Sequence, residues 1–209
     1  MTNYSLSLNN VQKVFGRRLI FKNINLTLTT GRVYGLSGRN GSGKSTLAKI
    51  IAGITSTTSG KIEHTLNGKE IKPEKLHDHL GFVSPYLVLY DEFTALENLE
   101  FFTKIRGNKF DKDNAEKLLE DFQLGDRGND ELRGYSSGMK QRMKFIFALM
   151  HSPQLLILDE PTSNLDEAGK SIVYSTIKNK LSDNLVIIAS NESSDLALCD
   201  EIIEIEKYK

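Results

Sequence analysis

The amino-acid sequence predicts an α/β fold in which a helical segment interrupts a core of strands and helices. Residues 5–36 alternate apolar and polar side chains in short stretches, which predicts half-buried strands. Strand and helix patterns alternate again after Pro153, which predicts a return to the same core. Between about residues 92 and 150 the apolar spacing is helical instead. The 209 residues suffice for one domain with a proper apolar core.

The first third of the chain predicts strands, one helix and a hairpin. Residues 24–29 alternate strictly, and residues 33–36 predict a short buried strand before a glycine-rich loop. A helix follows, because apolar residues recur at helical spacing and Gly53 provides a C-terminal stop. The Asn-Gly pair at residues 67–68 predicts a hairpin turn after a strand at residues 61–66.

The rest of the chain predicts the helical insert and the second half of the core. Thr94 and Glu97 form a predicted capping box at the start of the first inserted helix. Apolar residues at helical spacing predict two further helices, over residues 115–122 and 143–150. The elements predicted after these are a strand at residues 155–158, a helix at 166–181, a strand at 185–189, a short helix near Leu196 and a strand at 202–205.

The composition excludes several classes of protein. With 39% apolar and 26% charged residues the chain reads as an ordinary globular protein. Its longest apolar runs are far too short to cross a membrane, and its polar start has no secretory signal. The single cysteine, Cys199, cannot form an internal disulfide, which fits a reducing cytosol. The four histidines have no metal-ligand spacing, and we expect His77 and His79 in a solvated loop.

Charge is distributed unevenly along the chain. Acidic and basic residues balance at 27 each, so there is no basic excess to indicate a nucleic-acid partner. The first 62 residues, however, hold nine basic side chains and no acidic one. Such asymmetry is typical of a protein with an anionic ligand, although chance spacing explains the count equally well.

A glycine-rich motif predicts a phosphate-binding loop between a strand and a helix. The segment Gly38-Arg39-Asn40-Gly41-Ser42-Gly43-Lys44-Ser45 matches G-x-x-x-x-G-K-[ST], and Thr46 follows it. Glycines let consecutive N–H groups face one anion, and the helix that begins there adds its positive dipole end. Lys44 supplies a cation for the β- and γ-phosphates, and Ser45 a hydroxyl for Mg²⁺.

Two carboxylates follow a second buried strand and complete the predicted site. Asp159 ends the apolar run of residues 155–158 and is the expected Mg²⁺ partner of Ser45. Glu160 is placed to polarise a water molecule aimed at the γ-phosphate. Two acids after a strand could equally begin an ordinary loop, but together with the phosphate loop they predict nucleotide chemistry.

Further motifs resemble those of ABC-type ATPases. Residues 135–142, Y-S-S-G-M-K-Q-R, are similar to the family's signature motif, and residues 163–166, S-N-L-D, to its D-loop. The resemblance covers nearly the whole chain. It implies one ATP-binding domain over residues 1–209, with a P-loop NTPase (RecA-like) core and an N-terminal antiparallel β-subdomain (about 1–85 and 151–209). A helical subdomain would be inserted at about 86–150.

The resemblance also implies how ATP and Mg²⁺ would be bound. Two ATP-binding subunits, identical or different, would close head-to-tail over two ATP molecules. Each subunit would offer the other its signature residues and Asp166 of the D-loop. The signature residues concerned are Ser136, Ser137, Gly138 and Met139. Phe15 falls where the family stacks an aromatic ring on adenine, although an ordinary core phenylalanine is nearly as good an interpretation.

Two positions depart from the family's pattern. Pro85 stands where the family commonly has a glutamine that touches Mg²⁺ and the water, and proline offers no side-chain donor or acceptor. Asn191 stands where the family has a switch histidine. Asparagine can hydrogen-bond a γ-phosphate but cannot exchange a proton at neutral pH. We therefore expect Glu160, Lys44 and Asn191 to carry catalysis, at a reduced rate.

The leading hypothesis is an ATP-hydrolysing subunit that powers a membrane transporter. The pore would be a separate transmembrane permease, so the chain would sit in the cytoplasm, peripheral on the cytoplasmic face of the membrane. We expect docking near residues 86–97, because the apolar cluster 86–90 suits a groove for a short helix, unless it fills the helical insert. The compact size resembles exporters of the ABC-2 and haem or cytochrome c biogenesis groups.

Two other functions fit the same motifs. One is a soluble ABC-type ATPase that acts on DNA or ribosomes, although the chain lacks both the heptad coiled coil and the second cassette of those proteins. The other is a catalytically weak cassette that binds ATP, closes without efficient turnover and is paired with an active partner.

Overall fold

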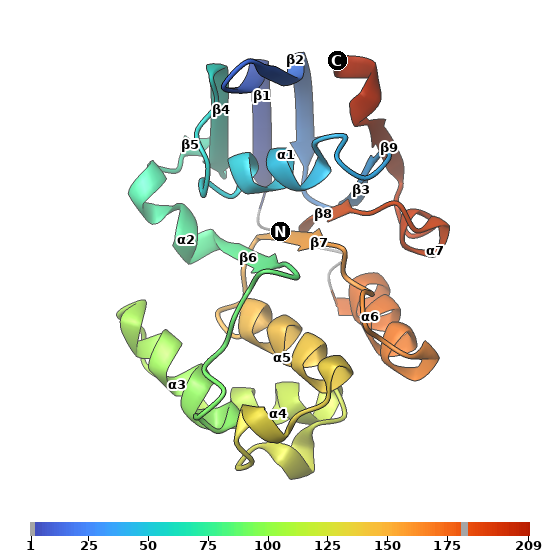
Figure 1. Cartoon of the computed structure of the whole chain (residues 1–209). Coiled ribbons are helices and arrows are strands. Elements are labelled where there is room, and N and C mark those ends of the chain that lie inside the picture. The colour runs from blue at the N-terminus through green and yellow to red at the C-terminus, as the bar shows by residue number, and fades with distance from the viewer. Residues whose placement is uncertain (1–2, 181–183) are drawn as a thin grey trace.

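The computed structural model describes residues 3–180 and 184–209, and these contain two β-sheets (Figure 1). The antiparallel sheet has the order β2-β1-β4-β5, and its strands are β1 (Tyr4–Phe15), β2 (Arg18–Thr29), β4 (Ser59–Leu66) and β5 (Lys69–Glu70). The parallel sheet has the order β6-β7-β8-β3-β9, and its strands are β6 (Leu80–Val83), β7 (Leu155–Asp159), β8 (Leu185–Ala189), β3 (Arg32–Ser37) and β9 (Glu201–Glu204).

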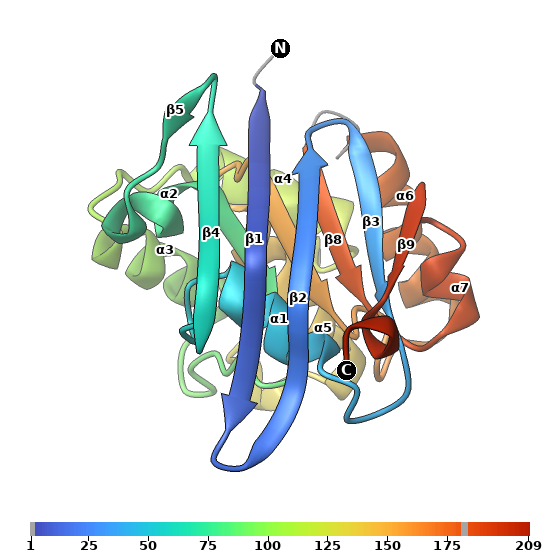
Figure 2. The ribbon, with the colours of Figure 1, turned by 90° about the horizontal axis from the view of Figure 1, so that it is seen from above.

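Helix α1 (Lys44–Ile51) lies between the two sheets and is covered by both (Figures 1 and 2). Its buried side chains Leu47 and Ile51 belong to one apolar core together with Leu6 of the antiparallel sheet and Ile187 of the parallel sheet. Because α1 starts at the phosphate-loop lysine, this packing fixes the loop against the body of the protein.

The other face of the parallel sheet packs on helices. A second core joins β7 and β8 to α5 (Ser137–Leu149), to α6 (Glu167–Lys180) and to α3 (Ala95–Ile105) and α4 (Lys112–Asp121). Strands β7 and β8 are buried on both faces, as parallel strands covered by helices must be. Two short helices, α2 (Leu76–His79) and α7 (Ser193–Leu196), complete the α/β fold that the sequence predicts.

Local sequence signals explain how several elements begin and end. Asn67 and Gly68 both have positive φ, as the tight turn between β4 and β5 requires. The predicted capping box is present, because Thr94 Oγ1 accepts from the Glu97 N–H at 3.1 Å and Glu97 Oε2 accepts from the Thr94 N–H at 2.8 Å. Gly53, with φ of 71°, follows the end of α1.

A few predictions of elements need correction. His77 and His79 lie on α2 and not in a loop, and His79 Nδ1 is 2.6 Å from Gln154 Oε1. The predicted strand at 202–205 is β9, which ends one residue earlier because Ile205 begins a 3₁₀ turn. Helix α6 matches the predicted helix at 166–181, whose last residue lies outside the described residues. No helix in the described ranges is long and apolar enough to span a membrane.

Candidate nucleotide-binding site

The phosphate loop connects the carboxyl end of β3 to the first turn of α1, the place where α/β sheets bind ligands. Gly38, Gly41 and Gly43 have φ values of 144°, 77° and 116°, which favour glycine. A Cβ on Gly43 would lie 2.7 Å from Ile20 Cγ2, so a side chain there would displace the loop from the antiparallel sheet. The loop thus has the backbone conformation that a phosphate cradle needs.

Lys44 lies inside this loop and is almost fully buried. Its Nζ donates to the carbonyl oxygens of Gly38 at 2.7 Å and Arg39 at 3.3 Å. These bonds compensate the buried ammonium and hold it at the centre of the loop. The ammonium therefore lies within the loop, bonded to two of its carbonyl oxygens.

Ser45 and Asp159, the two residues predicted to hold Mg²⁺, contact each other. Ser45 Oγ donates to Asp159 Oδ1 at 2.8 Å, and Asp159 Oδ2 is buried without a hydrogen-bond partner among the described residues. Burial raises the pKa of the Asp159 carboxyl, and the bond from Ser45 acts in the opposite direction. A hydroxyl beside a buried, unsatisfied carboxylate oxygen is a donor set that fits Mg²⁺.

Glu160 leaves the sheet just beyond this pair. Its backbone has φ of 49°, uncommon for a residue with a side chain, and its N–H donates to Ala189 O at 2.9 Å. This bond ties the turn to β8 and stabilises the unusual conformation. The Glu160 side chain lines the same cavity as Lys44 and Ser45, so one cavity holds the predicted phosphate, metal and base residues.

The cavity over the phosphate loop has a volume of about 440 Å³ and contains residues that the sequence did not single out for nucleotide binding. Phe15 lines it and is 50% exposed, so the alternative of a core phenylalanine is wrong. Lys13 Nζ lies 4.5 Å from the Phe15 ring centroid. Arg18, paired with Phe15 across the β1–β2 hairpin, and Tyr86, after β6, also line the cavity.

Asn191 reaches the phosphate loop from the end of β8. Its Nδ2 donates to Asn40 Oδ1 at 3.4 Å, and it shares a neighbouring cavity of about 450 Å³ with Glu160. The amide is thus close to the residues around the γ-phosphate position.

The signature residues lie apart from the phosphate loop of the same chain. Ser136 caps α5, because its Oγ accepts from the Met139 N–H at 3.2 Å, and both Ser136 and Ser137 are exposed. A Cβ on Gly138 would come within 3.3 Å of Asn164 O. Asp166 Oδ1 accepts from the Gly169 N–H at 2.8 Å. None of Ser136, Ser137, Gly138, Met139 and Asp166 lines the cavity over the phosphate loop.

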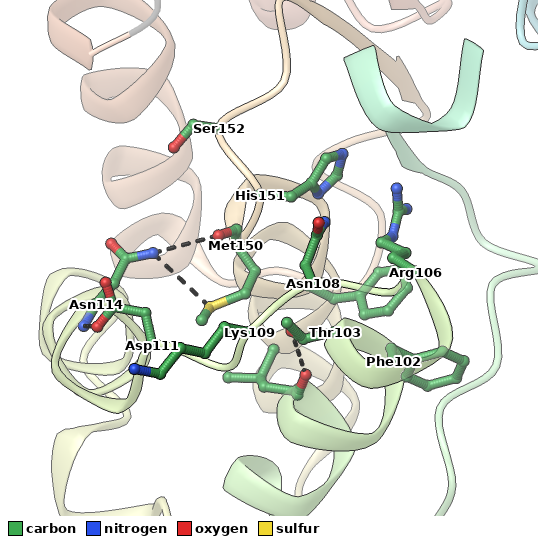
Figure 3. A pocket seen from close by; sticks show the side chains of 12 residues that line it. Phe102, Thr103, Arg106, Asn108, Lys109, Asp111, Asn114, Met150, His151 and Ser152 are labelled. Atoms are coloured by element: carbon green, nitrogen blue, oxygen red, sulfur yellow. Dashed lines mark hydrogen bonds between the residues drawn. The ribbon is translucent and has the colours of Figure 1, made fainter. Parts of the chain in front are cut away.

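A further cavity, of about 440 Å³, lies among the inserted helices (Figure 3). Its polar side chains are largely bonded to nearby backbone: Thr103 Oγ1 donates to Leu99 O at 2.7 Å, and Asn114 Nδ2 to Met150 O at 3.2 Å. It contains none of the residues predicted to bind nucleotide.

A sequence profile of the ABC transporter family matches residues 21–163, more than half of the chain. The chain belongs to the ABC transporter family. This ABC chain is 36% identical over 203 residues to the linearmycin resistance ATP-binding protein LnrL of Bacillus subtilis. It is also 35% identical over 186 residues to the lantibiotic transport ATP-binding protein SrtF of Streptococcus pyogenes.

These matches cover 94% and 89% of the ABC chain, and they span 65% of LnrL and 79% of SrtF. Among solved structures, a putative ABC transporter ATP-binding protein from Pyrococcus furiosus superposes with a TM-score of 0.83 at 25% identity. That match covers 98% of the ABC chain and 99% of the Pyrococcus chain. The comparisons confirm the predicted P-loop NTPase fold and an ATP-binding subunit of an ABC transporter.

Proposed function

We propose that this chain hydrolyses Mg²⁺-ATP and thereby powers a membrane transporter. The observation that carries the proposal is the single cavity shared by Lys44, Ser45 and Glu160, with Asp159 bonded to Ser45 beneath it. Each group has the chemistry that one part of the reaction requires, and all four are positioned by buried elements. This arrangement favours ATP hydrolysis over simple nucleotide storage.

The roles of the four side chains follow from their positions. Lys44 and the loop N–H groups would bind the β- and γ-phosphates, because their positive charge is concentrated at the loop centre. Ser45 and Asp159 would hold Mg²⁺, which supplies charge neutralisation between the phosphates. Glu160 would accept a proton from the attacking water, and Asn191 would orient the terminal phosphate by hydrogen bonding.

We infer that the chain works with a separate transmembrane permease in export. The names of LnrL and SrtF, which refer to antibiotic resistance and lantibiotic transport, support export. Tyr86, Val88 and Tyr90 are 74%, 80% and 47% exposed, whereas Leu89 is buried. An exposed apolar segment of this kind supports docking of a partner near residues 86–97, on the cytoplasmic face of the membrane.

We also infer that two ATP-binding subunits close over two ATP molecules. The exposed start of α5 supports this, because its N–H donors lie outside the cavity over the chain's own phosphate loop and could bind a phosphate held by a second chain. Ser137 and Gly138 would then complete the site of the partner subunit.

The decisive experiment is Glu160→Gln, which keeps the size and hydrogen bonding of the side chain but removes the base. We expect Mg²⁺-dependent phosphate release to fall about 10²–10³-fold while ATP binding is retained. Glu116→Gln, an exposed change on α4, is the matched control and should release phosphate at the native rate. Equal activity of Glu160→Gln and native chain would refute the proposed role of Glu160.

A catalytically weak cassette is the second candidate, and Pro85 and Asn191 favour it. Pro85 offers no side-chain hydrogen bond in place of the family's glutamine, and Asn191 cannot exchange a proton as the family's histidine can. The test mixes the native chain with its own Glu160→Gln variant, so that only native sites can hydrolyse ATP. A native chain that binds ATP but releases no phosphate above background, alone or in this mixture, would establish this alternative.

A further inference from the structure

We propose that Tyr86 is a catalytic residue, whose hydroxyl donates a hydrogen bond to the terminal phosphate of bound ATP. The proposal rests on the proposed ATPase function and names a residue that no sequence motif assigns. It also changes the expectation that Tyr86 serves only an apolar docking surface. Three observations support the proposal: the geometry of the turn after β6, the bonds that hold this turn, and the contacts of the Tyr86 side chain.

The turn is built to project the side chain of Tyr86. The Leu87 N–H donates to Ser84 O at 3.1 Å, which closes a tight turn with Pro85 and Tyr86 at its two central positions. Proline suits the first central position because its ring sets φ near the value that such turns require. The Tyr86 N–H donates to Ser84 Oγ at 3.2 Å. Pro85, which offers no side-chain hydrogen bond itself, therefore shapes the turn.

The turn is held in place by the helix that begins at the signature residues. Lys144 on α5 donates from Nζ to the carbonyl oxygens of Ser84 at 3.1 Å and Pro85 at 3.0 Å. Burial lowers the pKa of this lysine, as expected for an ammonium partly removed from water. Two charge-assisted bonds to consecutive carbonyls restrict the turn and hence the direction of the next side chain.

The Tyr86 ring lines the phosphate cavity together with Ser45, a predicted Mg²⁺ ligand. Lys49 Nζ is 4.6 Å from the ring centroid, and Lys49 follows Ser45 by one helical turn on the same face of α1. Tyr86 and Glu160 both line the cavity, whereas Phe15 and Arg18 enter it from the β1–β2 hairpin. Within the described residues the Tyr86 hydroxyl has no hydrogen-bond partner, so its O–H is free to donate to a phosphate oxygen.

The Tyr86 hydroxyl would thus be an uncharged hydrogen-bond donor beside the terminal phosphate, where negative charge changes most during hydrolysis. A donor positioned by a clamped turn stabilises a phosphate oxygen more in the transition state than in the bound substrate. Because the ring is 74% exposed, the hydroxyl contributes less than a fully buried donor would. The ring itself stays anchored by its contact with Lys49.

The test compares Tyr86→Phe with Tyr90→Phe in the purified full chain. Tyr86→Phe removes only the hydroxyl and keeps the ring on Lys49. Tyr90 shares the proposed docking segment but stacks on Phe102 and does not line the cavity, so in an assay without the membrane partner it is the matched control. We expect Tyr86→Phe to lower kcat for ATP about tenfold and to leave ADP affinity unchanged, with Tyr90→Phe at the native rate.

A second measurement separates binding from turnover. In the Glu160→Gln background, Tyr86→Phe should weaken ATP binding about threefold and leave ADP binding unchanged, because the lost bond is to the terminal phosphate. A native kcat in Tyr86→Phe, or equal loss of ATP and ADP affinity, overturns the proposal. If Tyr86→Phe lost activity only when the membrane partner is present, the catalytic role would also be overturned, and a docking role for Tyr86 would replace it.

The two proposals fail in different ways. If Glu160→Gln hydrolyses ATP like the native chain, the proposed function is wrong whatever Tyr86 does. If Glu160→Gln is inactive and Tyr86→Phe is fully active, only the role of Tyr86 is wrong. Both variants change exposed or cavity-lining side chains, and circular dichroism of each checks that the fold is intact.

Discussion

At the scale of single residues, Asp159 shows a conflict between stability and function. Its carboxylate is buried at the end of β7 with one oxygen unsatisfied, and burial raises its pKa. A group whose folded pKa is raised loses stabilisation as pH rises, because the ionised form is disfavoured in the folded state. The proposed function therefore requires the Asp159 charge, although the metal-free fold would be more stable without this charge.

Asp159→Asn should make the metal-free chain more stable and the enzyme inactive. Asparagine can still accept the Ser45 hydroxyl bond but carries no buried charge, so we expect Tm to rise by about 2–4 °C. Phosphate release should fall to background. Differential scanning calorimetry without Mg²⁺ and a phosphate assay with it measure the two effects, and a lowered Tm would contradict the first.

The sequence predicted those site residues whose positions follow from the order of strands and loops along the chain. Asp159 ends β7 and Glu160 follows it, whereas Lys44 and Ser45 follow β3 after the phosphate loop, so the parallel strands bring all four to one edge of the sheet. It did not predict that Tyr86 enters the cavity, because its direction depends on a turn held by Lys144 from a distant helix. Nothing in a linear pattern specifies such a tertiary bond.

At the scale of elements, His64 connects the antiparallel sheet to the end of α1. It is 7% exposed, and its Nδ1 lies 2.7 Å from the Tyr4 hydroxyl of β1. Burial lowers the pKa of His64 to about 4, and a bond with the Ile51 backbone at the end of α1 acts in the opposite direction. The ring is thus neutral in the folded protein over a range where it is charged when unfolded.

The free energy of unfolding should fall as pH drops from about 6.5 toward 4, because His64 binds a proton in the unfolded chain but not in the folded one. From these pKa values the loss between pH 7 and pH 5 is about 2 kcal/mol per histidine. His151, with its pKa also lowered by burial to about 4, should add a similar loss.

Urea unfolding at the two pH values, for the native chain and for His64→Gln, measures this loss. His64→Gln should remove about half of the pH dependence, because His151 remains. An identical pH dependence in His64→Gln and native chain would argue against the proposed cause.

Elements with strong periodicity were predicted well, and irregular ones were not. The alternation of residues 24–29 became buried and exposed positions of β2, since one face of that strand packs on α1 and the other does not. Helix α2 has only four residues and no apolar repeat, so no pattern predicts it. The register shifts between β1 and β2 depend on cross-strand packing, which a single strand does not encode.

At the scale of the whole molecule, the phosphate loop and the signature residues are the two separate halves of the site that we propose two subunits form together. The phosphate loop lies between the sheets and the signature residues begin α5 on the helical side (Figure 1). If hydrolysis needs both halves, phosphate release per chain should increase with protein concentration as dimers form. Sedimentation at each concentration gives the dimer fraction. Activity per chain that stays constant while the chain is monomeric would contradict dimer-dependent catalysis.

The charge asymmetry of the sequence acquires a partial explanation at this scale. Three of the nine cations before residue 63 line the phosphate cavity or the loop, namely Arg18, Arg39 and Lys44. They come from β2 and from the loop before α1, so folding concentrates part of the N-terminal positive charge at one place. Two more, Lys13 and Lys49, contact the Phe15 and Tyr86 rings that line the same cavity.

The bonds from Lys44 to the carbonyl oxygens of Gly38 and Arg39 affect the rate of nucleotide binding and the entropy that binding costs. A loop that is already closed around its own ammonium loses little conformational entropy when a nucleotide arrives. The ammonium only exchanges carbonyl partners for phosphate oxygens, which are better acceptors because they are charged. Selectivity for polyphosphates over weaker anions thus becomes a competition between the ligand and the protein's own backbone.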